Sequence, residues 1–115
     1  MLPYDERATY TATIRTFTEP DYDSDPRTDR TCDCEHCQRN TEAWMRDEWH
    51  YYGVIAEATV TTEIDGKTFD RKEGESLWGV DDIDPSYLNT VAAELKDDLV
   101  SFLTENYPGI TIEEE

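Results

Sequence analysis

Residues 84–107 read DPSYLNTVAAELKDDLVSFLTENY and carry the longest helical pattern in the chain. Asp84 is a favoured N-cap residue, Pro85 suits the first helical position, and Pro108 with Gly109 ends the run. Between these signals apolar residues recur at helical spacing: Leu88, Val91, Ala92, Leu95, Leu99, Phe102 and Leu103. Because such a stripe must be buried, we expect a long C-terminal helix packed on one face of a β-sheet.

The segment before this helix predicts a β-hairpin. Residues 65 and 66, Asp-Gly, form a typical two-residue hairpin turn, and the strands on either side span residues 50–64 and 67–80. The small side chains of Ala56 and Ala58 lie on the same side of the first strand. We therefore expect the long helix to lie against that side.

The register of the hairpin depends on a predicted β-bulge. A bulge near Gly74 would place Trp78 opposite Val54 and Val80 opposite Tyr52. This arrangement groups aromatic and aliphatic side chains across the two strands, which stabilises a sheet. We expect the bulge at that position.

The remaining segments complete a single α+β domain over residues 1–115, the size of one hydrophobic core. Residues 8–18 alternate between apolar and polar side chains and predict a third strand. Residues 41–49 predict a short helix, and residues 113–115, Glu-Glu-Glu, a frayed tail. We expect a three-stranded antiparallel sheet, which becomes four-stranded if residues 110–112 pair at its edge.

The charge of the chain is strongly acidic, with 28 acidic residues against 10 basic ones and a net charge of −18. Such a surface repels nucleic acid and anionic membranes and attracts a basic protein surface. Two explanations remain open: adaptation to high salt, which fits three lysines and fifteen threonines, and mimicry of a phosphate backbone. A homodimer is compatible with either explanation.

Two groups of carboxylates are candidates for contact with a basic partner. Residues 19–40 form a long polar segment that predicts an acidic, cysteine-containing loop. Its candidates are Asp21, Asp23, Asp25 and Asp29. The predicted outer face of the long helix adds Glu94, Asp97, Asp98 and Glu105. The alternating aspartates are similar to the start of a calcium-binding EF-hand loop, but Pro26 stands where that loop needs glycine.

Residues 32–37 read CDCEHC and predict a candidate zinc site. Thiolates and imidazoles are the ligands that tetrahedral zinc prefers, so Cys32, Cys34 and Cys37 would bind with either His36 or His50. The spacing is tighter than that of an ordinary zinc finger, and no second cysteine pair follows. Three free thiols, or a redox or intermolecular disulfide role, remain the alternatives.

Part of the chain resembles a group of small proteins. Residues 76–80 read SLWGV, acidic residues follow, and residues 86–95 read SYLNTVAAEL. This order resembles uncharacterised proteins encoded by phages of GC-rich hosts, in which a Leu-Trp-Gly-Val/Ile-acidic segment precedes a Tyr-Leu-x-x-Val-Ala-x-Glu-Leu helix. The similarity covers roughly residues 49–103. It implies a viral setting, where small acidic proteins block host defence enzymes, and it supplies no catalytic residues.

No catalytic motif is visible in the sequence. Neither histidine stands in a recognisable nucleophile or acid–base motif. Asp81, Asp82 and Asp84 could bind Mg²⁺ in a hydrolase, but carboxylates before a helix also favour its dipole. The acidic charge and the lack of a catalytic motif predict a non-enzymatic interaction protein. The resemblance to phage-encoded proteins implies that its target is a nucleic-acid-binding defence complex of the CRISPR or restriction type. The alternative is a salt-adapted, zinc-stabilised domain with a structural or regulatory role.

The sequence also carries expectations about location. Residues 1–6 lack the basic and apolar character of a signal peptide, and no apolar run has the length of a membrane span. Three cysteines, an odd number, fit poorly with a secreted disulfide framework. We expect a cytoplasmic protein, in the host cytoplasm if the chain is viral, with no membrane contact.

Overall fold

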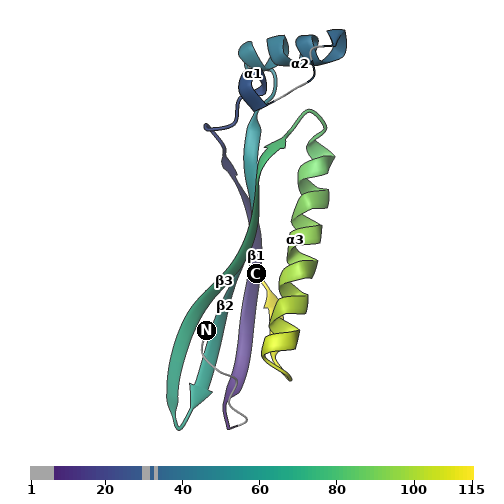
Figure 1. The fold of residues 1–115 in the computed structure, drawn as a ribbon. Helices are drawn as coiled ribbons and strands as arrows, with labels where there is room; N and C mark the ends of the chain where they lie inside the picture. Colours follow the sequence, from purple (N-terminus) through teal and green to yellow (C-terminus); the bar gives the residue numbers. More distant parts are fainter. Residues whose placement is uncertain (1–6, 30–31, 33) are drawn as a thin grey trace.

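The computed structural model describes residues 7–29, 32 and 34–115. Its elements follow in the order β1 (Thr9–Pro20), α1 (Pro26–Asp29), α2 (Glu35–Met45), β2 (Tyr51–Ile64), β3 (Lys67–Asp81), α3 (Pro85–Asn106) and β4 (Thr111–Glu114). The predicted α+β class is confirmed, with the long helix α3 packed on the sheet (Figure 1). Residues 1–6, where the sequence predicts no signal peptide, lie outside the described residues.

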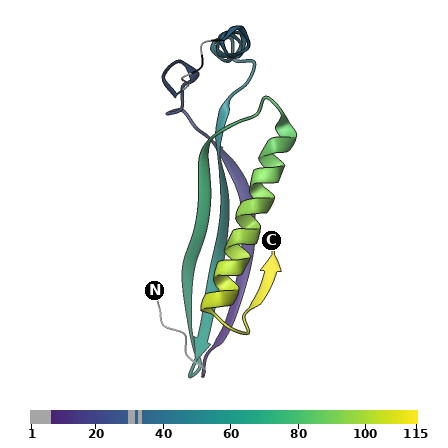
Figure 2. The same ribbon diagram turned by 45° about the vertical axis from the view of Figure 1, so that its right-hand side comes forward.

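The sheet has four strands in the order β3-β2-β1-β4. The pairs β1/β2 and β2/β3 are antiparallel as predicted, but β4 runs parallel to β1, so the sheet is mixed. The helix explains this direction. Because α3 carries the chain back along the sheet, β4 starts at the same end as β1 and follows the same course (Figure 2).

The β2–β3 hairpin turns at residues 65 and 66, as predicted. Both residues have positive φ angles, 52° and 76°, which the primed turn requires. Val80 pairs with Tyr52 as expected.

The position of the bulge was predicted wrongly. Gly74 pairs regularly with Glu57, Val54 pairs with Leu77 rather than Trp78, and the register shifts between Tyr52 and Val54. The reason is steric. The Trp78 ring covers Gly53, where any Cβ would collide with it, and Gly79 takes a positive φ of 73° that turns the strand.

The core lies between α3 and the covered face of the sheet. Leu99 and Leu103 of α3 are fully buried against Ala56, Ala58 and their neighbours, as the sequence predicts. Asp84 caps the helix by accepting a 3.1 Å hydrogen bond from the Ser86 backbone amide. A smaller cluster continues the core toward the start of α3: Val54, Val80 and Val91.

The segment between β1 and β2 is more ordered than the predicted loop. It holds α1 and α2, and α2 begins at Glu35, six residues before the predicted helix. Thr41, the predicted cap, lies inside α2, where its hydroxyl donates a 3.0 Å hydrogen bond to the Cys37 carbonyl. The predicted tail is also partly ordered, because β4 includes Glu113 and Glu114. Residues 30, 31 and 33 of the predicted loop lie outside the described residues.

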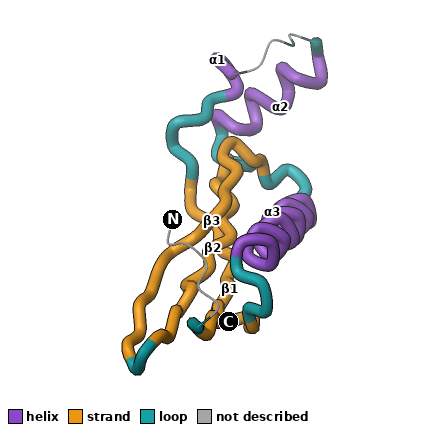
Figure 3. The backbone as a smooth tube through the Cα atoms, turned by 60° about the horizontal axis from the view of Figure 1, so that its bottom comes forward, coloured by secondary structure: helices purple, strands orange, loops and turns teal. Residues whose placement is uncertain are grey.

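The molecule is a rod, with extents of 62 × 22 × 19 Å. Helices α1 and α2 gather at one end, and the β2–β3 turn forms the opposite end (Figure 3). Among the described residues, none of the helices is long and apolar enough to cross a membrane. The rod therefore has three distinct regions: the helical end, the α3 face and the hairpin end.

Candidate functional site

The three cysteines converge at the start of α2. Cys34 is the N-cap residue, and its sulfur accepts a 3.5 Å hydrogen bond from the Cys37 backbone amide. The sulfur of Cys32 lies 3.1 Å from that of Cys34, and all three sulfurs lie within 4.8 Å of one another. Because tetrahedral zinc holds thiolates with bonds near 2.3 Å, its ligand sulfurs stand about 3.8 Å apart. The cluster is compact enough to hold a metal ion.

The proton affinities of the thiols also differ. The backbone hydrogen bond from Cys37, with further help from the Cys32 thiol, lowers the pKa of Cys34 to about 7. Hydrogen bonds with Cys32 and Cys34 raise the pKa of Cys37 to about 11. Cys34 is therefore the thiol that gives up its proton more readily than Cys37, and a bound cation would drive the loss of further protons.

The two histidines are separated from each other. His36 lies in the first turn of α2, with Nε2 3.3 Å from the Asn40 amide nitrogen. His50 lies beyond the other end of the helix, with Nε2 3.7 Å from a carboxylate oxygen of Asp47. Since α2 has eleven residues, about 16 Å of helix separates the two ends. The structure therefore does not bring His50 to the cysteines, and the converging ligand atoms it describes come from cysteines alone.

The aspartates of the β1–α2 segment serve its local structure. Asp21 accepts hydrogen bonds from the amides of Asp23 and Ser24, from the Ser24 hydroxyl and from the Gly79 amide. Partial burial raises the pKa of Asp21, but these hydrogen bonds, led by that of Ser24, lower it below the ordinary value. Asp25 forms an ion pair with Arg27 at 2.7 Å. The side chain of Asp29 lies outside the described part of the chain, and Asp23 is exposed.

The carboxylates of α3 are arranged differently. Glu94, Asp97, Asp98 and Glu105 are all exposed. The single basic residue of α3, Lys96, forms an ion pair with Glu114 of β4. The outer face of the helix consequently carries negative charge without a neutralising partner on the helix itself.

The aspartates considered for Mg²⁺ are used at the chain reversal before α3. Asp82 accepts a 2.7 Å hydrogen bond from the His50 amide, and Asp81 accepts one of 3.3 Å from the Ile83 amide. Asp84 caps α3. Among the described residues, these three do not form a group of converging metal ligands. Their geometry explains them as structural residues.

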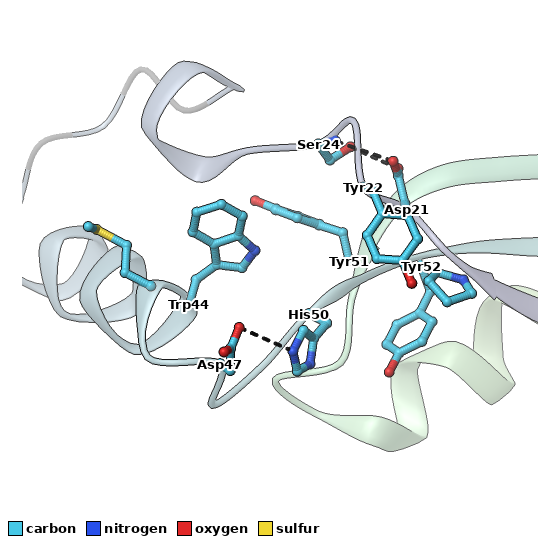
Figure 4. A pocket seen from close by; sticks show the side chains of 10 residues that line it. Asp21, Tyr22, Ser24, Trp44, Asp47, His50, Tyr51 and Tyr52 are labelled. Atoms are coloured by element: carbon cyan, nitrogen blue, oxygen red, sulfur yellow. Dashed lines mark hydrogen bonds and ion pairs between the residues drawn. The ribbon is translucent and has the colours of Figure 1, made fainter.

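A cavity that the sequence did not predict lies at the helical end of the rod, with a volume of about 460 Å³ (Figure 4). Aromatic rings and carboxylates dominate its lining. The lining residues are Pro20, Asp21, Tyr22, Ser24, Trp44, Met45, Asp47, His50, Tyr51 and Tyr52. The density of aromatic residues near the start of β2 was the available signal, but their convergence depends on the position of α2.

Comparisons with protein-family models, with curated proteins and with solved structures gave no significant match.

Proposed function

We propose that the chain is a non-enzymatic interaction protein whose acidic surface occupies the nucleic-acid-binding surface of a basic partner. The observation that carries this proposal is the amount of negative charge for the length of the rod. The net charge of the sequence is −18 and the rod is 62 Å long, so the average is roughly half the charge density of duplex DNA, which has one negative charge per about 1.7 Å. A surface of this kind offers a basic groove an alternative to its nucleic acid.

The α3 face supports the same proposal. Several basic residues elsewhere are already paired with carboxylates: Arg15 and Lys72 with Glu57, Arg27 with Asp25, Arg46 with Glu48, and Arg71 with Glu73. Lys96, the basic residue of α3, is paired with Glu114 of β4. The exposed carboxylates of α3 therefore remain for contact with a partner. We assign partner binding chiefly to Glu94, Asp97, Asp98 and Glu105. Asp21 already accepts hydrogen bonds from Ser24 and Gly79, and Asp25 is paired with Arg27.

The resemblance of residues 49–103 to phage-encoded proteins supports a defence complex as the partner. Restriction and CRISPR complexes hold nucleic acid in positively charged channels, which an acidic rod can enter. The site of action would then be the cytoplasm of the host.

A second candidate function rests on the cysteine cluster. Cys32, Cys34 and Cys37 would hold zinc, with a fourth ligand from His36 or from outside the chain, and the metal would order the helical end of a salt-adapted domain. The two functions are separable by experiment. Salt adaptation predicts that added KCl raises the free energy of unfolding, whereas mimicry predicts that added salt weakens partner binding.

The test of the proposed function compares two charge variants of α3. The neutralised variant loses four charges through the substitutions Glu94→Gln, Asp97→Asn, Asp98→Asn and Glu105→Gln. The charge-keeping variant retains them through Glu94→Asp, Asp97→Glu, Asp98→Glu and Glu105→Asp. Each protein is immobilised and exposed to nuclease-treated host lysate at low salt. We expect the wild type and the charge-keeping variant to capture nucleic-acid-binding proteins. Added duplex DNA should displace these proteins, and the neutralised variant should not capture them.

Two results would contradict the proposal. One is equal retention by the neutralised and wild-type proteins, which would mean that the charge of α3 is not used. The other is retention only of proteins that duplex DNA does not release. A normal unfolding midpoint for each variant controls for loss of structure.

A further inference from the structure

The cavity at the helical end is built from aromatic rings of separate segments. Trp44 belongs to α2, Tyr51 and Tyr52 begin β2, and Tyr22 follows β1 (Figure 4). Tyr51 is only 8% exposed, and the Trp49 ring packs edge-on against it at 4.9 Å. One wall of the cavity is therefore fixed before any ligand arrives.

The rim of the cavity is open. Tyr22 is 91% exposed, although its ring lines the cavity. In Figure 4 the Tyr51 side chain extends toward Trp44, while Asp47 and His50 lie together on another side. The Tyr22 ring is therefore open to solvent and accessible to a ligand that enters the cavity.

The charge of the lining is negative. Asp21 and Asp47 contribute carboxylates, and no lysine or arginine of the described residues lines the cavity. The carboxylate of Asp21 is held in place by hydrogen bonds from Ser24 and Gly79. Asp47 has a positive φ of 60° just after α2, and its side chain is 88% exposed. Its carboxylate lies 3.7 Å from Nε2 of His50, which also lines the cavity.

One of these rings already lies near a guanidinium group of the same chain. The Arg27 guanidinium carbon lies 5.4 Å from the Trp44 ring centroid, within the range of a cation–π contact. Arg27 does not line the cavity. Trp44 therefore lies near a cation of its own chain and also lines the negatively charged cavity.

We propose that this cavity binds a guanidinium group, presented as an arginine side chain on the surface of the basic partner. Aromatic rings with nearby carboxylates favour an organic cation over an anion or a neutral group. A guanidinium is favoured over an ammonium because it is planar, stacks on aromatic faces and is weakly hydrated. The volume of the cavity lies within the range of pockets that hold small ligands. The source of the arginine rests on the proposed function, but the site itself does not.

The test uses a probe that needs no partner. N-acetyl-arginine amide is titrated into the full chain at neutral pH and followed by two-dimensional NMR, with the citrulline analogue as a neutral control of the same shape. We expect the arginine probe to shift the resonances of Trp44, Tyr51 and Asp47, and the citrulline probe to bind much more weakly. Equal shifts from the two probes, or shifts confined to α3, would overturn the proposal.

Three variants sharpen the test. Asp47→Asn removes a charge while keeping a residue that tolerates the left-handed conformation, and should weaken the arginine probe by up to about five-fold, because contacts to an exposed carboxylate are weak. Trp44→Leu removes a cation–π contact and should weaken the probe by about two-fold to thirty-fold. Arg27→Gln should not weaken the probe, because Arg27 does not line the cavity.

Asp97→Asn is the matched control for charge. It removes the same charge from α3, away from the cavity, and should change the affinity far less than Asp47→Asn does. Equal effects of the two substitutions would overturn a local site. If Trp44→Leu fails to fold, the comparison of Asp47→Asn with Asp97→Asn still decides whether the cavity binds the probe. Probe binding with no capture of a partner would contradict the proposed function and leave this site intact.

Discussion

At the scale of single residues, Cys34 is both the cap of α2 and a candidate metal ligand. Its sulfur caps α2 by accepting from the Cys37 amide, and the same sulfur lies 3.1 Å from that of Cys32. Serine is a strong N-cap residue but has no thiolate. The substitution of Cys34 by serine therefore separates the two roles, since it keeps the cap and removes the metal ligand.

We expect zinc to bind the described cysteines with a stoichiometry near one per chain. Cys34→Ser should abolish that binding and leave the helix content unchanged. His50→Ala should retain zinc, because His50 lies beyond the far end of α2. Because Cys37 must lose a proton despite its pKa of about 11, the zinc affinity should rise as the pH increases through neutrality.

Metal analysis measures the zinc content of each protein. Competition with a chromophoric chelator at several pH values measures the zinc affinity. The cluster lies outside the core, so removal of zinc should leave the global free energy of unfolding nearly unchanged. Protein purified without chelator that contains no zinc, with all three thiols freely titratable, would contradict the site.

At the scale of elements, α3 supplies most of the buried apolar surface opposite the sheet. Leu99 is fully buried, Leu95 is partly buried and Asp97 is exposed. Leu99→Ala should lower the free energy of unfolding by about 2–5 kcal/mol. Asp97→Ala should change it by no more than about 0.5 kcal/mol, and Leu95→Ala should fall between them. Urea denaturation measures all three, and equal effects would mean that α3 buries a different face.

The sequence allowed the prediction of α3 and of the β2–β3 turn because their signals are local. The apolar spacing, the Asp84 cap and the Asp-Gly turn each need only neighbouring residues. The start of α2 was missed because cysteine is not among the usual N-cap residues, whereas Thr41 is. The bulge was misplaced because its cause, the Trp78 ring over Gly53, is a contact between strands.

The candidate sites divide in the same way. The cysteine spacing was visible in the sequence, and the structure brings the three sulfurs together. The choice between His36 and His50 could not be made, because it depends on the length and direction of α2. The aromatic cavity was also hidden, because Tyr22 and Trp44 meet Tyr51 only after the chain folds.

At the scale of the whole molecule, the long hairpin and α3 give a rod rather than a sphere. A rod exposes more surface for its mass than a sphere, which gives the described acidic residues more room to lie apart. Repulsion among like charges opposes compact structures, and the elongated form lessens it. The proposed contact with a nucleic-acid-binding groove would use the carboxylates exposed on this rod, those of α3 among them.

The most direct measurement is the equilibrium affinity of the purified chain for a nucleic-acid-binding partner captured by it, at increasing salt and in the presence of duplex DNA. If the acidic surface occupies the nucleic-acid groove, the affinity falls steeply with salt, and DNA and the chain exclude each other. A salt-independent affinity, or a stable ternary complex of partner, DNA and chain, would contradict mimicry of the phosphate backbone.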